Sequence, residues 1–167
     1  VQQWSTASTW WTFSSPDSTY TALNSSGTKV ANYLGNFRGV RSGTSIQPVV
    51  VASMESYTRQ VVPYESFGSW PVTAQAAQAV AARSYGAWYL THPISSRYDI
   101  CDTTTCQVFG GIDAETANTK AGVAASAGTV IAISGSPIRA EFSSSNLSLI
   151  HISEPTRRTP ISYAVFC

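Results

Sequence analysis

The stretch "VTAQAAQAVAARSYGAWYL" (residues 72–90) decides the fold of this chain. It contains no proline and consists mainly of residues with high helix propensity, so it predicts a helix from about 72 to 89. Pro71 stands directly before it, where proline suits the first turn of a helix. A helix with so many alanines has few bulky side chains and can pack closely against other backbone. We therefore expect a central, largely buried helix.

The segments before this helix predict strands and a second helix. "KVANYLGNFRGV" (29–40) and "SIQPVVVA" (45–52) carry β-branched residues and are bounded by Gly and Pro, which is typical of strands. Ser53 precedes "MESYTRQVV" (54–62), which predicts a short helix. This helix should end before Pro63, because the residue before a proline disfavours the α conformation.

The segments after the central helix predict one more helix and a hairpin. Asp113 can cap a helix that runs through residue 127 and stops at Gly128. "TVIAISG" (129–135) and "IRAEFSSS" (138–145) predict a hairpin with its turn at 136–137. Strands and helices do not alternate as βαβ units. We therefore expect an α+β fold with a mixed or antiparallel sheet, the central alanine-rich helix and one or two further helices.

The charge balance argues against several classes of partner. The chain has 10 Lys and Arg against 9 Asp and Glu, a net charge of +1. Such a chain has no electrostatic basis for binding nucleic acid or an anionic membrane, and no apolar run approaches the length of a membrane span. Abundant Ser, Thr, Ala and aromatic residues suit a protein that a bacterium exports. Motifs of the GxSxG, HExxH, CxxC or phosphate-loop type do not occur, so we expect no cofactor.

One acid, Glu65, stands among three aromatic rings in "PYESFGSW" (63–70). Taking a carboxylate out of water is costly and favours its protonated form. Glu65 is therefore either a hydrated loop residue or an acid kept protonated for catalysis. Glu55 and Glu115 need no such explanation, because an acid in the first turn of a helix complements the helix dipole. Glu141 is expected to face solvent on a strand.

Two polar residues of the central helix, Gln78 and Arg83, are candidates for the same site. They are five positions apart and so point roughly 140° away from each other. A buried guanidinium requires polar partners. Either Arg83 holds a loop or strand carbonyl as a structural residue, or one of the two residues faces a cleft beside Glu65.

Cys101 and Cys106 enclose four residues, which leaves three interpretations open. An exported chain with two cysteines this close most simply forms a local disulfide, which gains little entropy but fixes the strand that follows. The alternatives are a zinc site completed by His92 and a fourth ligand, or free thiols.

Several blocks of the sequence resemble the SpoIID/LytB family, named for a stage II sporulation protein and an amidase enhancer. In that family an acid follows a tyrosine after eight positions, as Glu65 follows Tyr57, and Trp-Pro comes next, as at 70–71. "AQAVAARSY" (77–85) matches the following block without a gap. "YDICDTTTCQVFGG" (98–111) resembles a later block, especially of actinobacterial members.

The resemblance implies peptidoglycan binding and cleavage outside the cell or in the cell wall. Glu65 matches the family's catalytic acid, and a lytic transglycosylase needs only this one acid for its chemistry. Tyr57, Gln78 and Arg83 are then candidates to position Glu65 or the sugar. The alternative is a non-catalytic wall-binding module that enhances an N-acetylmuramoyl-L-alanine amidase. A structural domain of a larger surface protein is the third interpretation.

The sequence departs from the family pattern at three positions near Glu65. Gln60 stands where glycine is usual, Ser66 stands where methionine is common after the acid, and Gln75 takes an apolar position. These departures leave Glu65 in place but change the groove expected beside it.

The two ends of the chain are expected to differ from its centre. Residues 1–28 form a segment rich in Ser, Thr and Trp, and 29–146 form the family-like domain, which we expect to be truncated at its C-terminus. The tail at 147–167, "LSLIHISEPTRRTPISYAVFC", resembles the translation of two sequencing adapters with a short index between them. We therefore expect this tail to be non-native and to pack against nothing.

Overall fold

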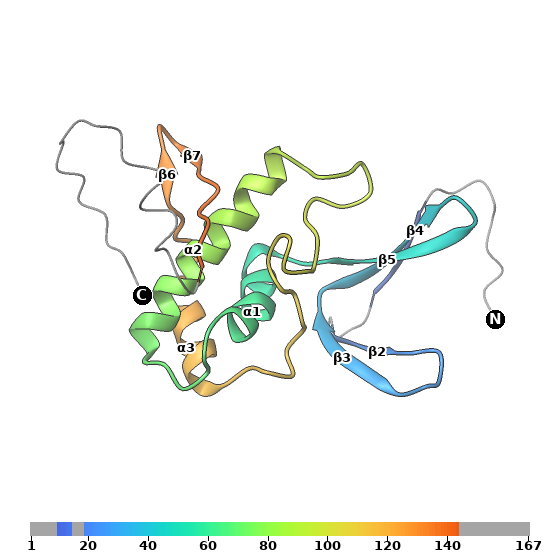
Figure 1. Cartoon of the computed structure of the whole chain (residues 1–167), viewed down its shortest axis with the longest axis horizontal. Helices are drawn as coiled ribbons and strands as arrows, with labels where there is room; N and C mark the ends of the chain where they lie inside the picture. The colour runs from blue at the N-terminus through green and yellow to red at the C-terminus, as the bar shows by residue number, and fades with distance from the viewer. Residues whose placement is uncertain (1–9, 15–18, 144–167) are drawn as a thin grey trace.

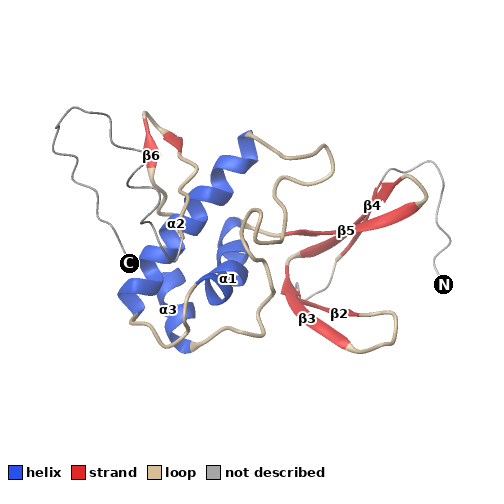
Figure 2. Ribbon diagram, viewed as in Figure 1, coloured by secondary structure: helices blue, strands red, loops and turns tan. Residues whose placement is uncertain are grey.

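The computed structural model describes residues 10–14 and 19–143 (Figure 1). The expectation for the tail at 147–167, and most of the one for the first residues of the chain, lie outside this part. In the described part the helices gather on one side and most strands on the other (Figure 2). The fold is α+β, as predicted, and every strand pair in this part is antiparallel.

Three helices and seven strands make up the described part of the chain. The helices are α1 (Met54–Glu65), α2 (Val72–Thr91) and α3 (Ala117–Ala125). The strands are β1 (Trp10–Phe13), β2 (Thr19–Leu23), β3 (Lys29–Leu34), β4 (Asn36–Ser42), β5 (Ser45–Val51), β6 (Ala132–Ile133) and β7 (Ser136–Pro137).

The strands form three small sheets. One has the order β1-β4-β5, and the others are the pairs β2-β3 and β6-β7. Gly35 lies between β3 and β4 and has a φ of 121°, which breaks the strand. The segment at 29–40, predicted as strand, therefore forms two strands in different sheets. Pro48 lacks an N–H and lies on β5, an edge strand, where a missing donor is tolerated.

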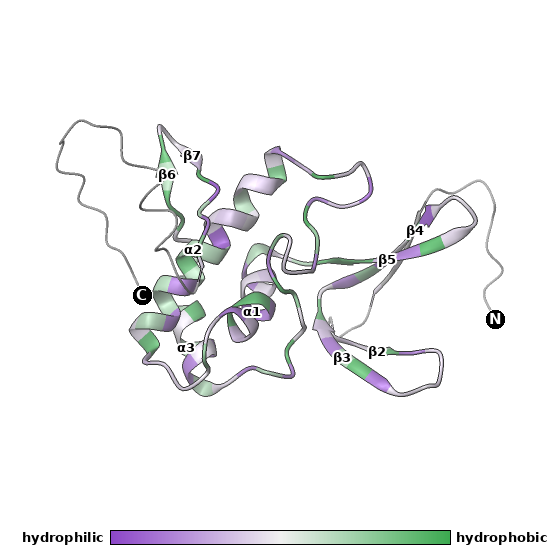
Figure 3. Ribbon diagram, in the orientation of Figure 1, coloured by the Kyte–Doolittle hydropathy of each residue, from purple (hydrophilic) through white to green (hydrophobic). Residues whose placement is uncertain are grey.

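Helix α2 lies at the centre of the helical part, as predicted, between α1, α3 and the β6-β7 hairpin (Figure 1). In Figure 3 most of α2 is pale or green, interrupted by a few purple residues. The core that it shares with the other two helices consists of Val61, Val62, Ala79, Ala82 and Val123. None of the helices in the described part is long and apolar enough to cross a bilayer.

Helices α2 and α3 approach closely at Gly122. A Cβ atom at this position would lie 2.4 Å from the Cβ of Gln75 and 2.8 Å from the backbone nitrogen of Ala76. We expect Gly122→Ala to lower the free energy of unfolding by about 1–3 kcal/mol, because backbone must move to admit the methyl group. Urea unfolding measures this loss. The control Ala121→Ser adds one atom at an exposed position of the same helix and should change little, and equal stability of both variants would contradict the close contact.

Helix α1 continues beyond its predicted end and includes Pro63. The local preference of the residue before proline is overridden because neighbours satisfy the carbonyls of this last turn. Ser66 donates its backbone N–H to the Val62 carbonyl at 3.1 Å, and Gly110 donates to the Gln60 carbonyl at 3.3 Å. The consequence is that Glu65 is the last helical residue and not a loop residue.

Helix α3 begins later than predicted, with Thr116 as its N-cap. The Thr116 hydroxyl accepts from the Thr119 N–H, and the Thr119 hydroxyl accepts from the Thr116 N–H, which forms a capping box. Asp113 does not cap this helix. Its carboxylate binds the Lys29 ammonium at 2.8 Å and the Asn32 backbone N–H at 2.9 Å, and so ties the loop before α3 to β3.

The hairpin near the end of the described part has its turn earlier than predicted. Ser134 and Gly135 both have positive φ, 51° and 81°, which suits a tight hairpin turn. Residues 136–137 belong to β7 and pair with β6.

Candidate functional site

One face of α1 carries the residues of the candidate site. Tyr57, Gln60 and Tyr64 are spaced by three and four positions, so the helical period brings them to the same side, and Glu65 follows at the end of the helix. The segment 107–112 lies along this face, and every one of its first four residues contacts one of these side chains.

Two glycines allow this segment to approach so closely. A Cβ at Gly110 would lie 2.3 Å from the Tyr64 ring, whose hydroxyl donates to the Gly110 carbonyl at 2.7 Å. Gly111 has a φ of 85°, and Ile112 then donates its N–H to the Asn32 carbonyl of β3 at 2.8 Å. The segment is therefore fixed between α1 and β3.

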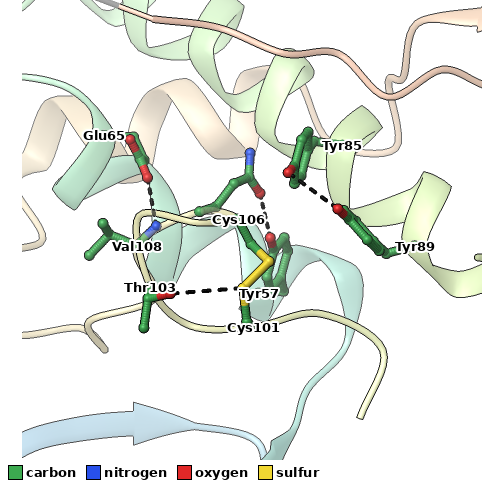
Figure 4. Close-up of a disulfide and its surroundings, with 9 residues drawn as sticks. Tyr57, Glu65, Tyr85, Tyr89, Cys101, Thr103, Cys106 and Val108 are labelled. Atoms are coloured by element: carbon green, nitrogen blue, oxygen red, sulfur yellow. Dashed lines mark hydrogen bonds between the residues drawn. A yellow bond between two sulfur atoms is a disulfide. The ribbon is translucent and has the colours of Figure 1, made fainter. Parts of the chain in front are cut away.

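Glu65 is partly buried at the end of α1 and faces this segment (Figure 4). The backbone N–H of Val108 donates to its Oε1 atom at 2.6 Å. Within the described residues no other hydrogen bond to this carboxyl occurs. The structure thus places Glu65 in a half-buried position, with one oxygen held in a fixed direction.

Tyr57, one of the predicted site residues, lies on the same helix as Glu65 in a partly buried position and contacts the same segment (Figure 4). Its hydroxyl donates to the Oε1 atom of Gln107. Its ring stacks on Phe109 with centroids 5.8 Å apart, and Phe109 stacks in turn on Tyr33 at 5.7 Å. Burial, together with nearby Tyr85 and Glu65, raises the pKa of Tyr57 well above its ordinary value, so its hydroxyl remains a donor.

Two further tyrosines come from α2. Tyr85 and Tyr89 are buried, and their hydroxyl oxygens lie 3.4 Å apart. Burial, and then the contact with Tyr89, raises the pKa of Tyr85 to about 12. The Tyr85 hydroxyl therefore stays neutral at physiological pH.

Gln78 and Gln107 each have a buried amide nitrogen, Nε2, with no hydrogen-bond partner among the described residues. Gln107 is 1% exposed, and its other amide atom is occupied by Tyr57. A buried donor without an acceptor is costly. Gln107 was not identified from the sequence as a site residue, although the block that contains it, 98–111, resembles a block of the family.

Arg83, predicted to bind substrate, lies instead on the opposite side of α1 from this segment. It is 1% exposed, and its guanidinium forms two hydrogen bonds of 2.9 Å with the Glu55 carboxylate. It also donates to the carbonyl of Thr129 at 3.0 Å. The structure therefore does not bring Arg83 to Glu65, and the structural interpretation, that it holds a loop carbonyl, describes its contacts.

Cys101 and Cys106 are joined by a disulfide in the structure (Figure 4). Their sulfur atoms are therefore bound to each other and not to zinc, and His92 stacks on Trp88 with centroids 4.0 Å apart. The Phe109 N–H donates to the carbonyl of Asp102 at 3.3 Å, inside the closed loop. The disulfide loop thus supports the segment that holds Glu65.

We expect Cys101→Ser/Cys106→Ser to lower the free energy of unfolding by about 2 kcal/mol, the chain-entropy value for so short a loop. The same double variant should weaken any activity of Glu65, since Val108 lies two residues after Cys106. Urea unfolding and activity measure the two effects, and the mass after alkylation without reductant checks the bond. The wild type with reductant serves as the matched comparison, and a wild-type chain that alkylates fully without reductant would contradict the disulfide.

The family model of the stage II sporulation protein SpoIID matches residues 42–132, which is more than half of the 167 residues. The chain belongs to the SpoIID family. It is 33% identical over 105 residues to the amidase enhancer of Bacillus subtilis (strain 168), which covers 63% of this chain and 14% of that protein. It is 31% identical over 80 residues to an uncharacterized protein of Brachyspira hyodysenteriae, 47% of this chain and 22% of that protein. The chain thus spans less than a quarter of either relative, and no solved structure matches it.

The three residues that depart from the SpoIID/LytB pattern all have polar side chains that form hydrogen bonds in the structure. Gln60 is fully buried, and its side-chain amide accepts from the N–H of Leu34 and donates to the carbonyl of the same residue. It thus pairs with the end of β3 as another strand would. Ser66 and Gln75 contact each other, with 2.7 Å between the hydroxyl and Oε1. The segment after Glu65 is therefore held by hydrogen bonds at both of these positions.

Proposed function

We propose that this domain binds peptidoglycan and cleaves its glycan strands as a lytic transglycosylase, with Glu65 as the acid and base. The observation that carries the proposal is the geometry of Glu65. Its carboxyl is partly buried, one oxygen accepts from a backbone N–H, and the neutral hydroxyl of Tyr57 lies near enough to feel its charge. Membership in the SpoIID family and similarity to an amidase enhancer support a role related to the bacterial cell wall.

The Val108 N–H binds one oxygen of Glu65, Oε1, and leaves the other oxygen, Oε2, for the reaction. In the proposed reaction Oε2 carries the proton that is donated. Oε2–H gives its proton to the glycosidic oxygen, and the bond from this oxygen to the sugar C1 breaks. The positive charge that develops at C1 is of the oxocarbenium type.

The carboxylate that remains then acts as the base. It takes the proton from the C6 hydroxyl of the same sugar while the C6 oxygen bonds to C1. The product is a 1,6-anhydro sugar, no water is consumed, and Glu65 is again protonated. Tyr57 and Gln107 act as positioning residues, because they fix the segment whose Val108 N–H orients Glu65.

Product analysis tests this proposal. The full chain is incubated with purified peptidoglycan, and the soluble fragments are weighed by mass spectrometry. We expect 1,6-anhydro ends, which are lighter by one water than the reducing ends that a hydrolase leaves. Fragments with reducing ends, or none at all, would contradict the transglycosylase proposal.

A second candidate function is favoured by one observation, the name of the Bacillus subtilis relative. On this alternative the domain binds the wall and enhances a partner N-acetylmuramoyl-L-alanine amidase without cleaving glycan itself. Adding the chain to an amidase on purified peptidoglycan distinguishes the two. A faster release of stem peptides without anhydro fragments would support the enhancer.

A further inference from the structure

Phe67, two residues after Glu65, exposes 72% of its surface. The Trp70 ring packs against it edge to face, with centroids 5.5 Å apart. A chain of two residues spans at most about 7 Å, so this ring pair lies directly beside the carboxyl-bearing end of α1. A single exposed apolar residue is common on protein surfaces. Phe67 differs from such residues because hydrogen bonds fix the backbone of the turn that carries it.

The turn that carries the two rings is fixed by side chains from α2 and the start of α3. The fully buried Gln75 donates its Nε2 to the Phe67 carbonyl at 2.7 Å. Thr116 donates its hydroxyl to the Gly68 carbonyl at 3.0 Å, and Asn118 donates to the Trp70 carbonyl at 3.0 Å. The backbone that carries the exposed ring is thus held in place before any ligand arrives, which lowers the entropy cost of binding.

We propose that Phe67 and Trp70 form a binding subsite for one pyranose ring of a glycan strand, next to the bond that Glu65 cleaves. This inference rests on the proposed function. A pyranose has an apolar face of C–H groups, and an aromatic ring is an apolar surface whose electron-rich face attracts such hydrogens. The strand continues on both sides of the bond under attack, so sugar rings must lie against the residues that flank Glu65.

The surface is too small for a protein partner. Stable protein interfaces bury about 800 Å² on each side, whereas the exposed apolar residues near Glu65 in the described part are Tyr64, Phe67 and Val72. Tyr64 and Val72 are each 37% exposed. One ring and its edge-packed neighbour match the dimensions of one sugar.

Binding of a short soluble oligomer of β-1,4-linked N-acetylglucosamine tests the subsite in the full chain. Glu65→Gln is the parent, so that no turnover occurs, and calorimetry gives the affinity. We expect Phe67→Ala to weaken binding about tenfold and Phe67→Trp to restore it. The control Ile46→Ala removes an apolar side chain that is 61% exposed on β5 and should leave the affinity unchanged.

The outcomes separate the subsite from the proposed catalysis. Unchanged affinity in Phe67→Ala, or a parent that does not bind the oligomer, overturns the subsite. If Phe67→Ala loses affinity but the wild type releases no anhydro fragments, the subsite stands and the transglycosylase proposal fails. Because Phe67 is exposed, the variant should unfold at the same urea concentration as its parent. A lowered midpoint in Phe67→Ala would redirect the test to Trp70→Phe, which keeps an aromatic ring and should retain most of the affinity.

Discussion

Glu65→Gln is expected to reduce the release of anhydro fragments by about a hundred- to ten-thousand-fold. Glutamine keeps the shape of the side chain and an oxygen that accepts from the Val108 N–H. It can neither donate a proton to the glycosidic oxygen nor take one from the C6 hydroxyl. Initial rates on purified peptidoglycan measure the effect, and the far-ultraviolet circular dichroism should match that of the wild type.

The matched control for this prediction is Glu141→Gln. Glu141 is an exposed carboxylate that pairs with Arg139, so its neutralisation changes the net charge equally without touching the site. The variant should retain wild-type rates. If Glu65→Gln cleaves glycan as fast as Glu141→Gln, Glu65 is not the acid.

The helical centre of this domain follows directly from the sequence. The alanine-rich stretch forms α2 within two residues of the predicted ends, because high propensity and close packing favour the same structure. Pro63 shows the limit of local rules, since Gly110, far along the chain, helps to satisfy the last turn of α1 and local preference cannot report this. The same limit explains Asp113, whose partners on β3 are about eighty positions away.

The site was only partly predictable for the same reason. Glu65 and Tyr57 follow from motif spacing on one helix, and the structure shows both bound to the segment that begins at Gln107. Gln107 and Val108 reach them through tertiary packing alone. The Gln107 amide nitrogen is buried without a hydrogen-bond partner in the described part of the chain, and burial is not visible in the sequence. Arg83 was assigned by its place in a motif, but a motif does not state which way a helical side chain points. Its partner Glu55 was explained by the helix dipole alone, and its contact with Arg83 was missed.

The ion pair between Glu55 and Arg83 gives the second large expected effect. Glu55→Gln should lower the free energy of unfolding by roughly 2–3 kcal/mol. Removing one partner of a buried ion pair costs about 3–5 kcal/mol, and the partial exposure of Glu55, 42%, reduces this value. Arg83, 1% exposed, would be left without its carboxylate. The Gly128 N–H, 3.0 Å from the same carboxylate, would bond to the glutamine less strongly.

The pH dependence gives this prediction its sharpest test. Desolvation raises the pKa of Glu55, but hydrogen bonds from Arg83 and Gly128 and the charge of Arg83 outweigh it, so the net shift is downward. The pKa of a glutamate in the unfolded chain is about 4.3. Because the folded-state pKa of Glu55 is lower, its ionised form stabilises the folded protein at pH values above the unfolded-state pKa. This stabilisation is lost as the pH falls through the folded-state pKa. Urea midpoints of the wild type should therefore fall more steeply below about pH 4.5 than those of Glu55→Gln.

Lys29→Gln is the control for charge loss without burial. Lys29 pairs with Asp113 on the surface, with 49% of its side chain exposed, and its loss should change the midpoint at neutral pH only slightly. A surface pair is screened by water and salt, whereas Arg83 is enclosed by α2, α1 and the loop after α3. Added salt should therefore reduce the effect of Lys29→Gln more than that of Glu55→Gln. Equal losses in the two variants would show that the Arg83–Glu55 pair contributes no more than a surface contact, and the helical core alone would then hold α1 on α2.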